Sequence, residues 1–266
     1  MEKVKFYCVT NKKVNFLNKK NYYLSWVGKD APPLDYLRCD KNNNIFYKEQ
    51  YYSELTFHYW YWKNLLKLEN EDQWIGFCQK RRYWIKIKNK KLISEKNIND
   101  YLITEPLDNW KNFDAIICKS INVSGAKKIK ILKRGLRNIL KKPSAFFIKE
   151  NQNLAFHFDM HHGFGNLDKA INQLDNKNKH EFKNFVESNI TFNPHIMFIS
   201  KPKVLNEWFS NLFPWLERCE KVYDFNKLKG YDTRRLLAYL SERYLSYWFN
   251  RYYKCKEENW VQLNNF

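Results

Sequence analysis

The segment SELTFHYWYWKNLLKLENEDQWIGFCQKRRYW, residues 53–84, places a helical pattern directly before a strand-like run. Leu55, Tyr59 and Trp62 recur at helical spacing, and other aromatic residues occupy the remaining sides, which predicts a helix buried all round. Ser53 is the expected N-cap, because its hydroxyl can accept an unpaired backbone N–H. The run WIGFC that follows has the length and composition of a buried strand.

Comparable patterns continue on both sides of this segment. Further strand-like runs occur at 4–9, 114–118, 144–148 and 195–200. Helical patterns cover 53–68, 166–188, 203–220 and 232–250, the last behind an Asp232-Thr233 cap. Because strands alternate with helices, we expect a single α/β domain over 1–266, with a mostly parallel sheet flanked by helices and a helical C-terminal third. Ligands bind at the carboxyl ends of the strands in such sheets.

The charge balance is strongly basic, since 47 Lys and Arg against 28 Asp and Glu give a net charge of +19. A Lys- and Asn-rich composition is one explanation. A nucleic acid, an anionic membrane surface or a phosphate-bearing substrate are the functional ones. No helix-turn-helix, zinc-finger or leucine-zipper pattern occurs, so sequence-specific nucleic acid recognition is the least supported. The basic stretch 127–142 is either a mobile loop or an amphipathic helix.

Several features point to a cytoplasmic location. No apolar run approaches the roughly 18 residues that a membrane-spanning helix needs. The first residues, MEKVKFYCVTNKK, lack the apolar core of a signal peptide and resemble a first strand. The six cysteines are scattered without a CxxC pair, which favours buried free thiols, as for Cys8 and Cys118.

Arg81 and Arg82 follow the WIGFC strand and therefore stand at its carboxyl end. Guanidinium groups bind phosphate oxygens through two donors at once, which suits a diphosphate leaving group. The alternative is a solvated or core-capping basic turn. No GxxxxGK[ST], GxGxxG or DxD pattern is present, so a phosphorylated ligand would have to be neutralised by Arg and Lys.

The run HFDMHH carries a second candidate site. If it is extended, the alternating residues His157, Asp159 and His161 share one face. That face could hold a metal ion, act as an acid/base pair, or simply be a polar turn.

A third candidate, Glu242-Arg243, lies in a helical pattern with Arg235 seven residues earlier. It is either a structural ion pair or a contact for a sugar hydroxyl.

Seven segments together resemble a bacterial glycosyltransferase family of capsule, exopolysaccharide and lipopolysaccharide O-antigen pathways, long classified only as a domain of unknown function. They run in the family's order and span nearly the whole chain. The matching segments are YCVTNKK (7–13), NNNIFYKEQYYSELTFHYWYWKN (42–64), WIGFCQKRRYW (74–84), DAIICK (114–119), HHGFGNLDKAI (161–171), MFISKPKVLNEWFSNLFPWLERCE (197–220) and LSERYLSYW (240–248).

The resemblance implies a GT-A-like α/β fold and sugar transfer from a nucleotide-sugar donor. Its characterised activity is inverting galactofuranosyl transfer from UDP-galactofuranose to a lipid-linked glycan at the inner membrane face. It implies donor contacts at Thr10 and Lys12, and at the matching positions Asn44 and Glu54. The chain departs from the family pattern in three places, which are Asn11 for the usual His, Gln79-Lys80 for His-Tyr and Asn166-Leu167 for Asp-Leu.

Within this resemblance, Arg81 and Arg82 are expected to stabilise the diphosphate in place of a metal ion, so no cofactor is predicted. Inversion needs a base, for which Asp159 is the first choice and Glu242 the second, with His161 beside Asp159 and Arg243 assigned to the donor. The expected partners are a UDP-sugar, a lipid-linked acceptor and an anionic membrane, without nucleic acid. The alternatives are a non-enzymatic polysaccharide- or nucleic-acid-binding protein and a metal-dependent hydrolase.

Overall fold

The computed structural model describes residues 3–263, which group into two compact units. The first unit runs to Lys119 and adds His195–Ser210 and the chain from Phe249 onward. The second unit comprises Ser120–Pro194 and Asn211–Trp248. The expectation of one domain over 1–266 stays a prediction.

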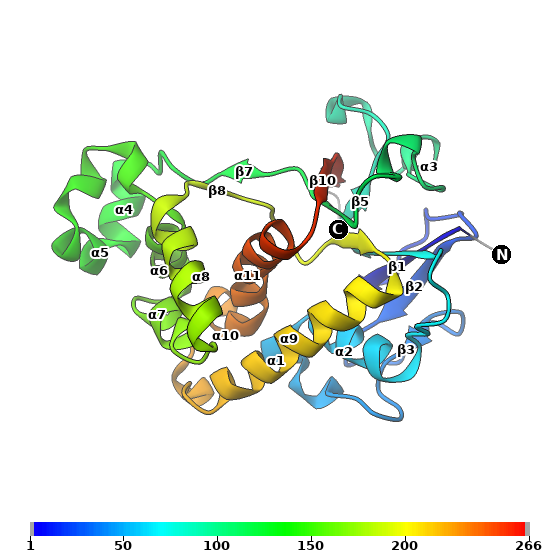
Figure 1. The fold of residues 1–266 in the computed structure, drawn as a ribbon, viewed down its shortest axis with the longest axis horizontal. Coiled ribbons are helices and arrows are strands. Elements are labelled where there is room, and N and C mark those ends of the chain that lie inside the picture. Colours follow the sequence, from blue (N-terminus) through cyan, green and yellow to red (C-terminus); the bar gives the residue numbers. More distant parts are fainter. Residues whose placement is uncertain (1–2, 264–266) are drawn as a thin grey trace. The chain divides into compact units, whose positions relative to one another are not determined.

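The first unit is built on a mixed sheet with the strand order β10-β6-β9-β4-β1-β2-β3, in which β5 also pairs with β4, and β11 pairs with β5. Figure 1 labels β1, β2, β3, β5 and β10 of this sheet. Its strands are β1 (Val4–Thr10), β2 (Tyr22–Trp26), β3 (Leu37–Arg38), β4 (Trp74–Gln79), β5 (Arg82–Trp84), β6 (Ala115–Cys118), β9 (Phe198–Ser200), β10 (Cys255–Glu258) and β11 (Trp260–Gln262). Its helices are η1 (Phe46–Lys48), α1 (Glu49–Tyr52), α2 (Leu55–Asn64), η2 (Lys90–Leu92), α3 (Ile98–Tyr101), η3 (Asp108–Trp110) and the start of α9 (Pro202–Glu220).

The central strands are parallel, which confirms the predicted mostly parallel sheet. β1 pairs in parallel with both β2 and β4, β2 with β3, and β10 with β6. β9 runs antiparallel between β4 and β6, and β5 and β11 extend the sheet in the antiparallel sense. Strands β2, β3, β5, β10 and β11 were not predicted, and in β10 the charged residues hide the strand pattern.

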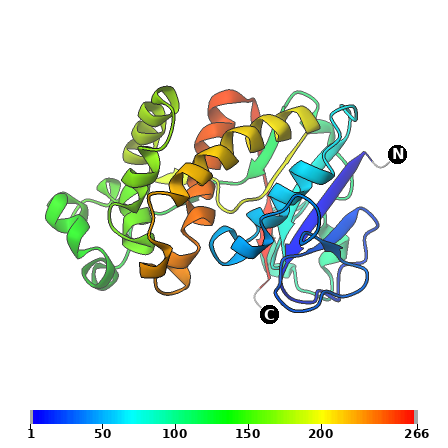
Figure 2. The same cartoon turned by 90° about the horizontal axis from the view of Figure 1, so that it is seen from below.

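Both faces of β1 are buried, because its side chains alternate between two layers of packing. Phe6 and Cys8 join one apolar cluster with Tyr83, Trp84 and Trp110. Tyr7 faces α2, where its ring centroid lies 4.8 Å from that of Tyr61. Figure 2 shows α2, in cyan, running alongside β1. Burial on two sides explains why this strand reads as a continuous apolar run.

The start of α2 differs from the prediction. Ser53 has a φ of +53° and ends α1 instead of capping α2. Its hydroxyl donates to the Glu54 carboxylate, and that carboxylate stands before the first turn of α2. Negative charge there is favoured by the helix dipole, so Glu54 and not Ser53 complements this helix start.

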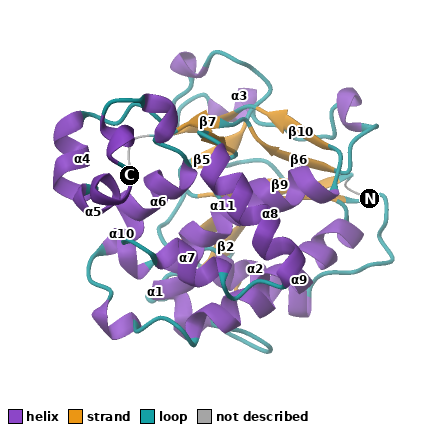
Figure 3. Cartoon of the chain, turned by 60° about the vertical axis from the view of Figure 1, so that its left-hand side comes forward, coloured by secondary structure: helices purple, strands orange, loops and turns teal. Residues whose placement is uncertain are grey.

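The second unit is mostly helical, with β7 and β8 as its two described strands (Figure 3). They pair as β7 (Ile121–Asn122) with β8 (Thr191–Phe192). Its helices are α4 (Lys128–Arg134), α5 (Leu136–Lys141), η4 (Pro143–Phe146), η5 (Lys149–Asn151), α6 (Leu154–His162), α7 (Asn166–Ile171), α8 (Asn176–Ser188), η6 (Phe225–Lys227), α10 (Tyr231–Arg234), the end of α9 and most of α11 (Leu236–Tyr252).

Three predictions fall in this unit with different outcomes. The basic stretch 127–142 is helical, as one of the two alternatives stated, and Gly135 divides it into α4 and α5. The strand predicted at 144–148 is wrong, because Pro143 opens the short helix η4 there. Asp232 does not cap a helix over 232–250, since it lies inside α10 and α11 begins separately at Leu236.

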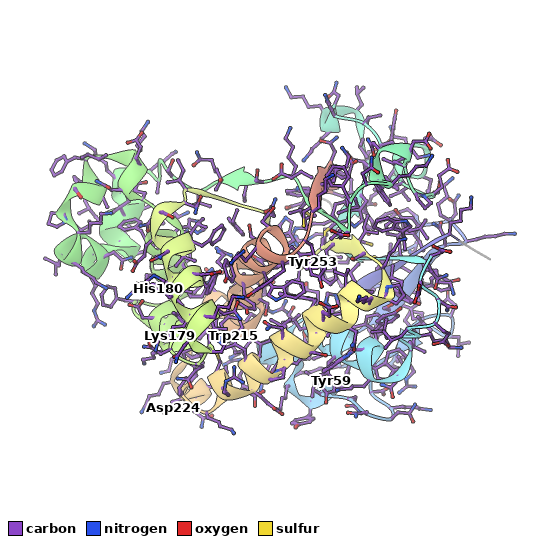
Figure 4. The ribbon with its side chains drawn as sticks, viewed as in Figure 1. Tyr59, Lys179, His180, Trp215, Asp224 and Tyr253 are labelled. Carbon is purple, nitrogen blue, oxygen red and sulfur yellow. The ribbon has the colours of Figure 1, made fainter. Side chains whose placement is uncertain are left out.

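The buried end of α9 supports the second unit. Trp215, labelled in Figure 4, is fully buried on α9. Its indole Nε1 donates to the backbone oxygen of Ala170 at 2.8 Å, and its ring lies 4.6 Å from that of Tyr244. A buried indole needs such an acceptor, so this contact ties α7, α9 and α11 together.

Within residues 3–263, no helix is both long enough and apolar enough to cross a membrane. Cys8 and Cys118 are buried free thiols, as predicted.

Candidate active site

The carboxyl ends of β1 and β4 meet at one edge of the sheet. The parallel register aligns Val9 with Gln79, so the residues that follow each strand are neighbours. The Lys80 backbone N–H donates to the Val9 oxygen at 3.1 Å, and its ammonium donates to Asn11 Oδ1 at 2.5 Å. The two predicted donor segments, at Thr10 and at Arg81, are therefore brought together in this unit.

Thr10 shapes the loop after β1 through its own hydroxyl. The side chain is 1% exposed, and its Oγ1 donates to the Lys12 carbonyl oxygen at 2.5 Å while accepting the Lys12 N–H at 3.0 Å. The hydroxyl is thus occupied within the turn. The Lys12 side chain is exposed, so this turn presents a cation to solvent.

A tight turn at Lys80 and Arg81 joins β4 to the antiparallel strand β5. Arg82 Nη1 donates to Gln79 Oε1 at 2.7 Å, and the Leu263 N–H donates to the Arg81 carbonyl at 2.8 Å. The Tyr83 hydroxyl donates to the Lys80 carbonyl. These contacts fix the backbone of the turn, so its cationic side chains start from a defined position.

The guanidinium groups in this turn are incompletely satisfied. The Nε atoms of Arg81 and Arg82 are buried and have no hydrogen-bond partner anywhere in the described chain. Neither residue forms an ion pair with a carboxylate between residues 3 and 263. A buried donor without a partner costs about 1–3 kcal/mol. A bound anion would satisfy these donors and offset the concentrated positive charge.

Asn44 and Glu54 make local contacts in this unit. Asn44 Oδ1 accepts the Phe46 N–H at 3.0 Å, and its amide nitrogen donates to the Asn42 oxygen at 2.9 Å. Glu54 accepts the Ser53 hydroxyl before α2. The Asn44 side chain therefore shapes the loop that leads into η1, and a role for either residue toward a donor stays a prediction.

The HFDMHH run is helical, which overturns the extended geometry assumed for it. Asn153 caps α6 by accepting the Phe156 N–H at 2.9 Å, and Gly163, with a φ of +100°, ends the helix. His157 and His161 lie one turn apart, with ring centroids separated by 4.7 Å. Two residues along a helix rotate by about 200°, so Asp159 points away from both imidazoles.

The histidines of α6 are held in the neutral state. Burial lowers the pKa of His157 to about 2, reinforced by the nearby Arg243 charge. Burial likewise lowers the pKa of His161 to about 4 and that of His162 well below its usual value. Across residues 3–263, no group of three His, Cys, Asp or Glu side chains has an arrangement that could hold a metal ion.

Arg243 lies inside the second unit with its charge compensated. It is 2% exposed, donates Nη1 to Glu242 Oε2 at 2.8 Å, and lies 3.2 Å through Nη2 from His157 Nδ1. Its guanidinium also covers the Phe192 ring at 4.1 Å from the centroid. Because the Arg donates, the His157 Nδ1 is the acceptor and its proton is on Nε2. The geometry matches the structural ion pair that was one of the two interpretations of this segment.

A cavity of about 570 Å³ opens in the second unit between α4, α5, α6 and the segment before α11. Its polar wall combines Asp159 and His161 of α6 with Arg134 and Asp232. Arg134 Nη1 lies 3.4 Å from both His161 Nδ1 and Asp232 Oδ2. Burial raises the pKa of Asp159 to about 6, partly opposed by a hydrogen bond from the Gly165 backbone. A carboxyl group in a cavity with a pKa near neutrality suits a general base.

Two of these residues, Arg134 and Asp232, were not predicted as site residues. Arg134 lies in the basic stretch that was considered only as a whole. Asp232 was interpreted as a helix cap, but its carboxylate contacts Arg134 and its carbonyl lies 2.8 Å from His162 Nδ1. Neither contact follows from spacing along the chain, because the partners are 98 and 70 residues apart.

The model of the domain of unknown function DUF4422 matches residues 5–254. The chain belongs to the DUF4422 family. No curated protein matches the chain. Among solved structures, the apo form of WbbM, a bifunctional glycosyltransferase, is similar at a TM-score of 0.70 and 16% identity. The similarity covers 98% of this chain and 45% of WbbM, so the chain spans less than half of that protein. At this identity the comparison establishes a glycosyltransferase-like α/β fold.

In this DUF4422 chain, the three departures from the expected family pattern all make hydrogen bonds within their own unit. Asn11 accepts the Lys80 ammonium, and Gln79 accepts the Arg82 guanidinium. Asn166 donates from Nδ2 to the His162 oxygen at 2.8 Å, across the tight turn that contains Gly163. Asn11 and Gln79 therefore position cations at the sheet edge, where the side chains determine which ligand can bind.

Proposed function

We propose that this chain is a glycosyltransferase that transfers a sugar from a UDP-sugar to a growing cell-surface glycan on a lipid carrier. The observation that carries the proposal is the cationic turn after β4, where two buried guanidinium Nε atoms lack partners at the carboxyl edge of parallel strands. The glycosyltransferase-like fold and the DUF4422 membership support it. UDP-galactofuranose is the donor proposed first, and the transfer is proposed to invert the configuration at the anomeric carbon.

The proposed role of Arg81 and Arg82 is to bind the diphosphate as it leaves. Charge builds up on the leaving diphosphate when the bond to the sugar breaks, and donors already fixed in place stabilise it most effectively. The turn is anchored at both ends by backbone contacts, and Arg82 is held by Gln79. Lys12 and Lys80 add positive charge at the same edge. Under this proposal the guanidinium groups supply the stabilisation that a divalent ion would otherwise provide.

The proposed base is Asp159. It must remove a proton from the acceptor hydroxyl, and a pKa of about 6 leaves it largely ionised at neutral pH while keeping it basic. Glu242 is less suited, because its carboxylate already accepts from Arg243 inside the unit. The cavity beside Asp159 is the proposed acceptor site, with His161 as a neutral hydrogen-bonding group.

The test is a panel of UDP-hexoses, including the furanose form of galactose, assayed with and without EDTA. We expect UDP and one UDP-sugar to raise the melting temperature, and transfer to persist in EDTA. Oligonucleotides of matched charge serve as the control for non-specific binding. Stabilisation by oligonucleotides but not by UDP would contradict the proposal, and loss of transfer in EDTA would remove its metal-independent part.

A further inference from the structure

The segment 127–149 combines two properties that rarely occur together on a surface. It contains nine Lys and Arg residues and no Asp or Glu. It also exposes six large apolar side chains, which are Ile129, Leu132, Leu136, Leu140, Phe147 and Ile148. So many large apolar side chains exposed within one short segment favour an interaction site. We call this set of nine cations and six apolar residues the basic apolar surface.

The pair of helices α4 and α5 has a buried inner face and an exposed outer face. Ile131 and Asn138 are buried, and Ile131 packs with Phe156 and Met160 in a small core below α4 and α5. Gly135 lies where the two helices meet, and a Cβ there would come within 3.0 Å of the Ile131 oxygen. Figure 1 shows α4 and α5, in green, as a pair of short helices beside α6.

The exposed apolar residues fall at helical intervals on each helix. Ile129 and Leu132 are three residues apart on α4, and Leu136 and Leu140 are four apart on α5, so each pair shares one face. Their exposed fractions run from 51% for Leu132 to 75% for Leu140. Phe147, at 76% exposed, follows directly after η4. The inner core does not need these side chains, since they remain in water.

We propose that the basic apolar surface is a docking site for an anionic lipid bilayer. Aliphatic side chains gain by entering the interface between headgroups and acyl chains, while flanking Lys and Arg extend to the lipid phosphates. A polyanion such as RNA would use the cations but leave Ile129, Leu132 and Leu140 in water. An acidic bilayer satisfies both halves of the surface, which is why the lipid is favoured as the occupant.

The surface also adjoins the cavity of the second unit. Lys133, Arg134, Leu136 and Arg137 line that cavity, and they come from the two helices that carry the exposed apolar residues. A lipid-linked acceptor held in the bilayer would therefore present its glycan next to the cavity wall. This last step rests on the proposed function, whereas docking itself does not.

The experiment is flotation of the full chain with vesicles of phosphatidylcholine alone or mixed with phosphatidylglycerol. We expect flotation with the anionic vesicles only. The variant Leu140→Ser with Phe147→Ser should reduce bound protein at least tenfold, and Lys127→Gln with Lys128→Gln should reduce it severalfold. Leu34→Ser with Leu68→Ser is the matched control, because both leucines are exposed outside this surface, and it should float as the original protein does.

Three outcomes would overturn the docking proposal. Equal flotation of Leu140→Ser with Phe147→Ser and the original chain would mean that charge alone causes binding. Preference for an oligonucleotide over anionic vesicles, measured in competition, would assign the surface to nucleic acid. Since the substituted side chains are exposed, unchanged thermal melting checks that each variant is folded. Flotation without sugar transfer would support docking and refute the proposed function. Transfer to a soluble acceptor without flotation would support the proposed function and refute docking.

Discussion

The cationic turn after β4 and the Arg243 network use the same side chain in opposite ways. In both places a guanidinium Nε is buried without a partner. Arg243 is almost fully enclosed, and its charge is met by Glu242 and by His157. Arg81 and Arg82 are only half-buried and have no carboxylate partner among residues 3–263. A compensated internal cation holds a fold together, while an uncompensated cation near solvent is available to an anionic ligand.

The largest expected effect is on stability and comes from Arg243→Met. The substitution removes the cation that faces Glu242 and donates to His157, and breaking a buried pair from one side costs about 3–5 kcal/mol. Urea unfolding should show that loss. Arg251→Met is the matched control, because Arg251 is an exposed arginine on the same helix and should change stability by less than about 0.5 kcal/mol. Normal stability with lost UDP binding would instead make Arg243 a ligand contact.

Arg81→Ala should have the opposite effect, lowering turnover while leaving stability nearly unchanged. Losing one preorganised donor to a developing charge lowers turnover by about 10²–10³-fold. Unfolding free energy should change little, since a half-buried side chain with an unpaired Nε is removed. Steady-state kinetics with the UDP-sugar found in the donor panel would measure the loss, and Arg82→Ala should behave similarly.

Arg81→Lys is the informative control for this prediction. It keeps the positive charge but removes the paired donors, so its activity should lie between those of the alanine variant and the original protein. A lysine variant as inactive as the alanine variant would show that the two-donor geometry, and not the charge, is what matters. Original-like turnover in both alanine variants would eliminate the turn as the diphosphate site.

The sequence was sufficient to predict β1, β4, β6 and β9 and the longer helices, but not the other strands of the sheet or the structure of residues 144–148. The runs that became β1, β4 and β6 are buried on both faces, and continuous burial leaves a clear apolar signature. The run at 144–148 looks the same in sequence, but Phe147 and Ile148 are exposed. Apolar content alone cannot distinguish a residue that fills a core from one that faces solvent.

The HFDMHH segment shows how a helix can imitate a strand. Burial alternates residue by residue along α6, from buried Leu154 to buried His162. The alternation arises because α4, α5, α7, α8 and α10 all contact α6, so side chains on several sides of the helix are covered. The available sequence signals were the end residues Asn153 and Gly163, which are typical of helix boundaries.

The candidate site was predictable only where both members of a contact follow neighbouring parallel strands. Thr10 and Arg81 lie at the carboxyl ends of β1 and β4, and the parallel pairing of these strands brings both residues to the same edge of the sheet. The Arg134 contacts with His161 and Asp232 depend on the packing of helices, and no local pattern encodes such packing.

Acid should destabilise the protein through its buried neutral histidines, which are His58 in the first unit and His157, His161 and His162 in the second. Burial lowers the pKa values of these imidazoles, so in mild acid below pH 6.5 they bind protons mainly in the unfolded state. Unfolding free energy should therefore fall on acidification, by up to about 2 kcal/mol per imidazole between pH 6.5 and 5. Asp159 acts with the opposite sign, because its raised pKa lets the folded state bind a proton between its ordinary 3.8 and about 6.

Asp159→Asn isolates that contribution. Without the carboxyl group the acid-induced loss of stability should become steeper below pH 6, while stability at pH 7 should rise, since an ionised buried carboxylate is removed. In the original protein kcat/KM should fall below pH 6 as Asp159 becomes protonated, and this ionisation should be absent from the kcat/KM profile of Asp159→Asn. Parallel stability curves for the variant and the original protein between pH 4 and 7 would show that Asp159 does not titrate as described.

The smallest expected effect comes from Lys12→Ala, at the same sheet edge as the arginines. Lys12 is exposed, so its attraction for a diphosphate acts through water and is worth about 0.2–1 kcal/mol. KM for the donor should rise by less than about fivefold with kcat unchanged, and the difference should vanish at high salt because screening removes it. The backbone of the turn is held by Thr10, so the fold should be unaffected. A loss of turnover as large as that of Arg81→Ala would show that an exposed cation contributes as much here as a half-buried one. It would indicate that the loop after β1 closes over the bound diphosphate.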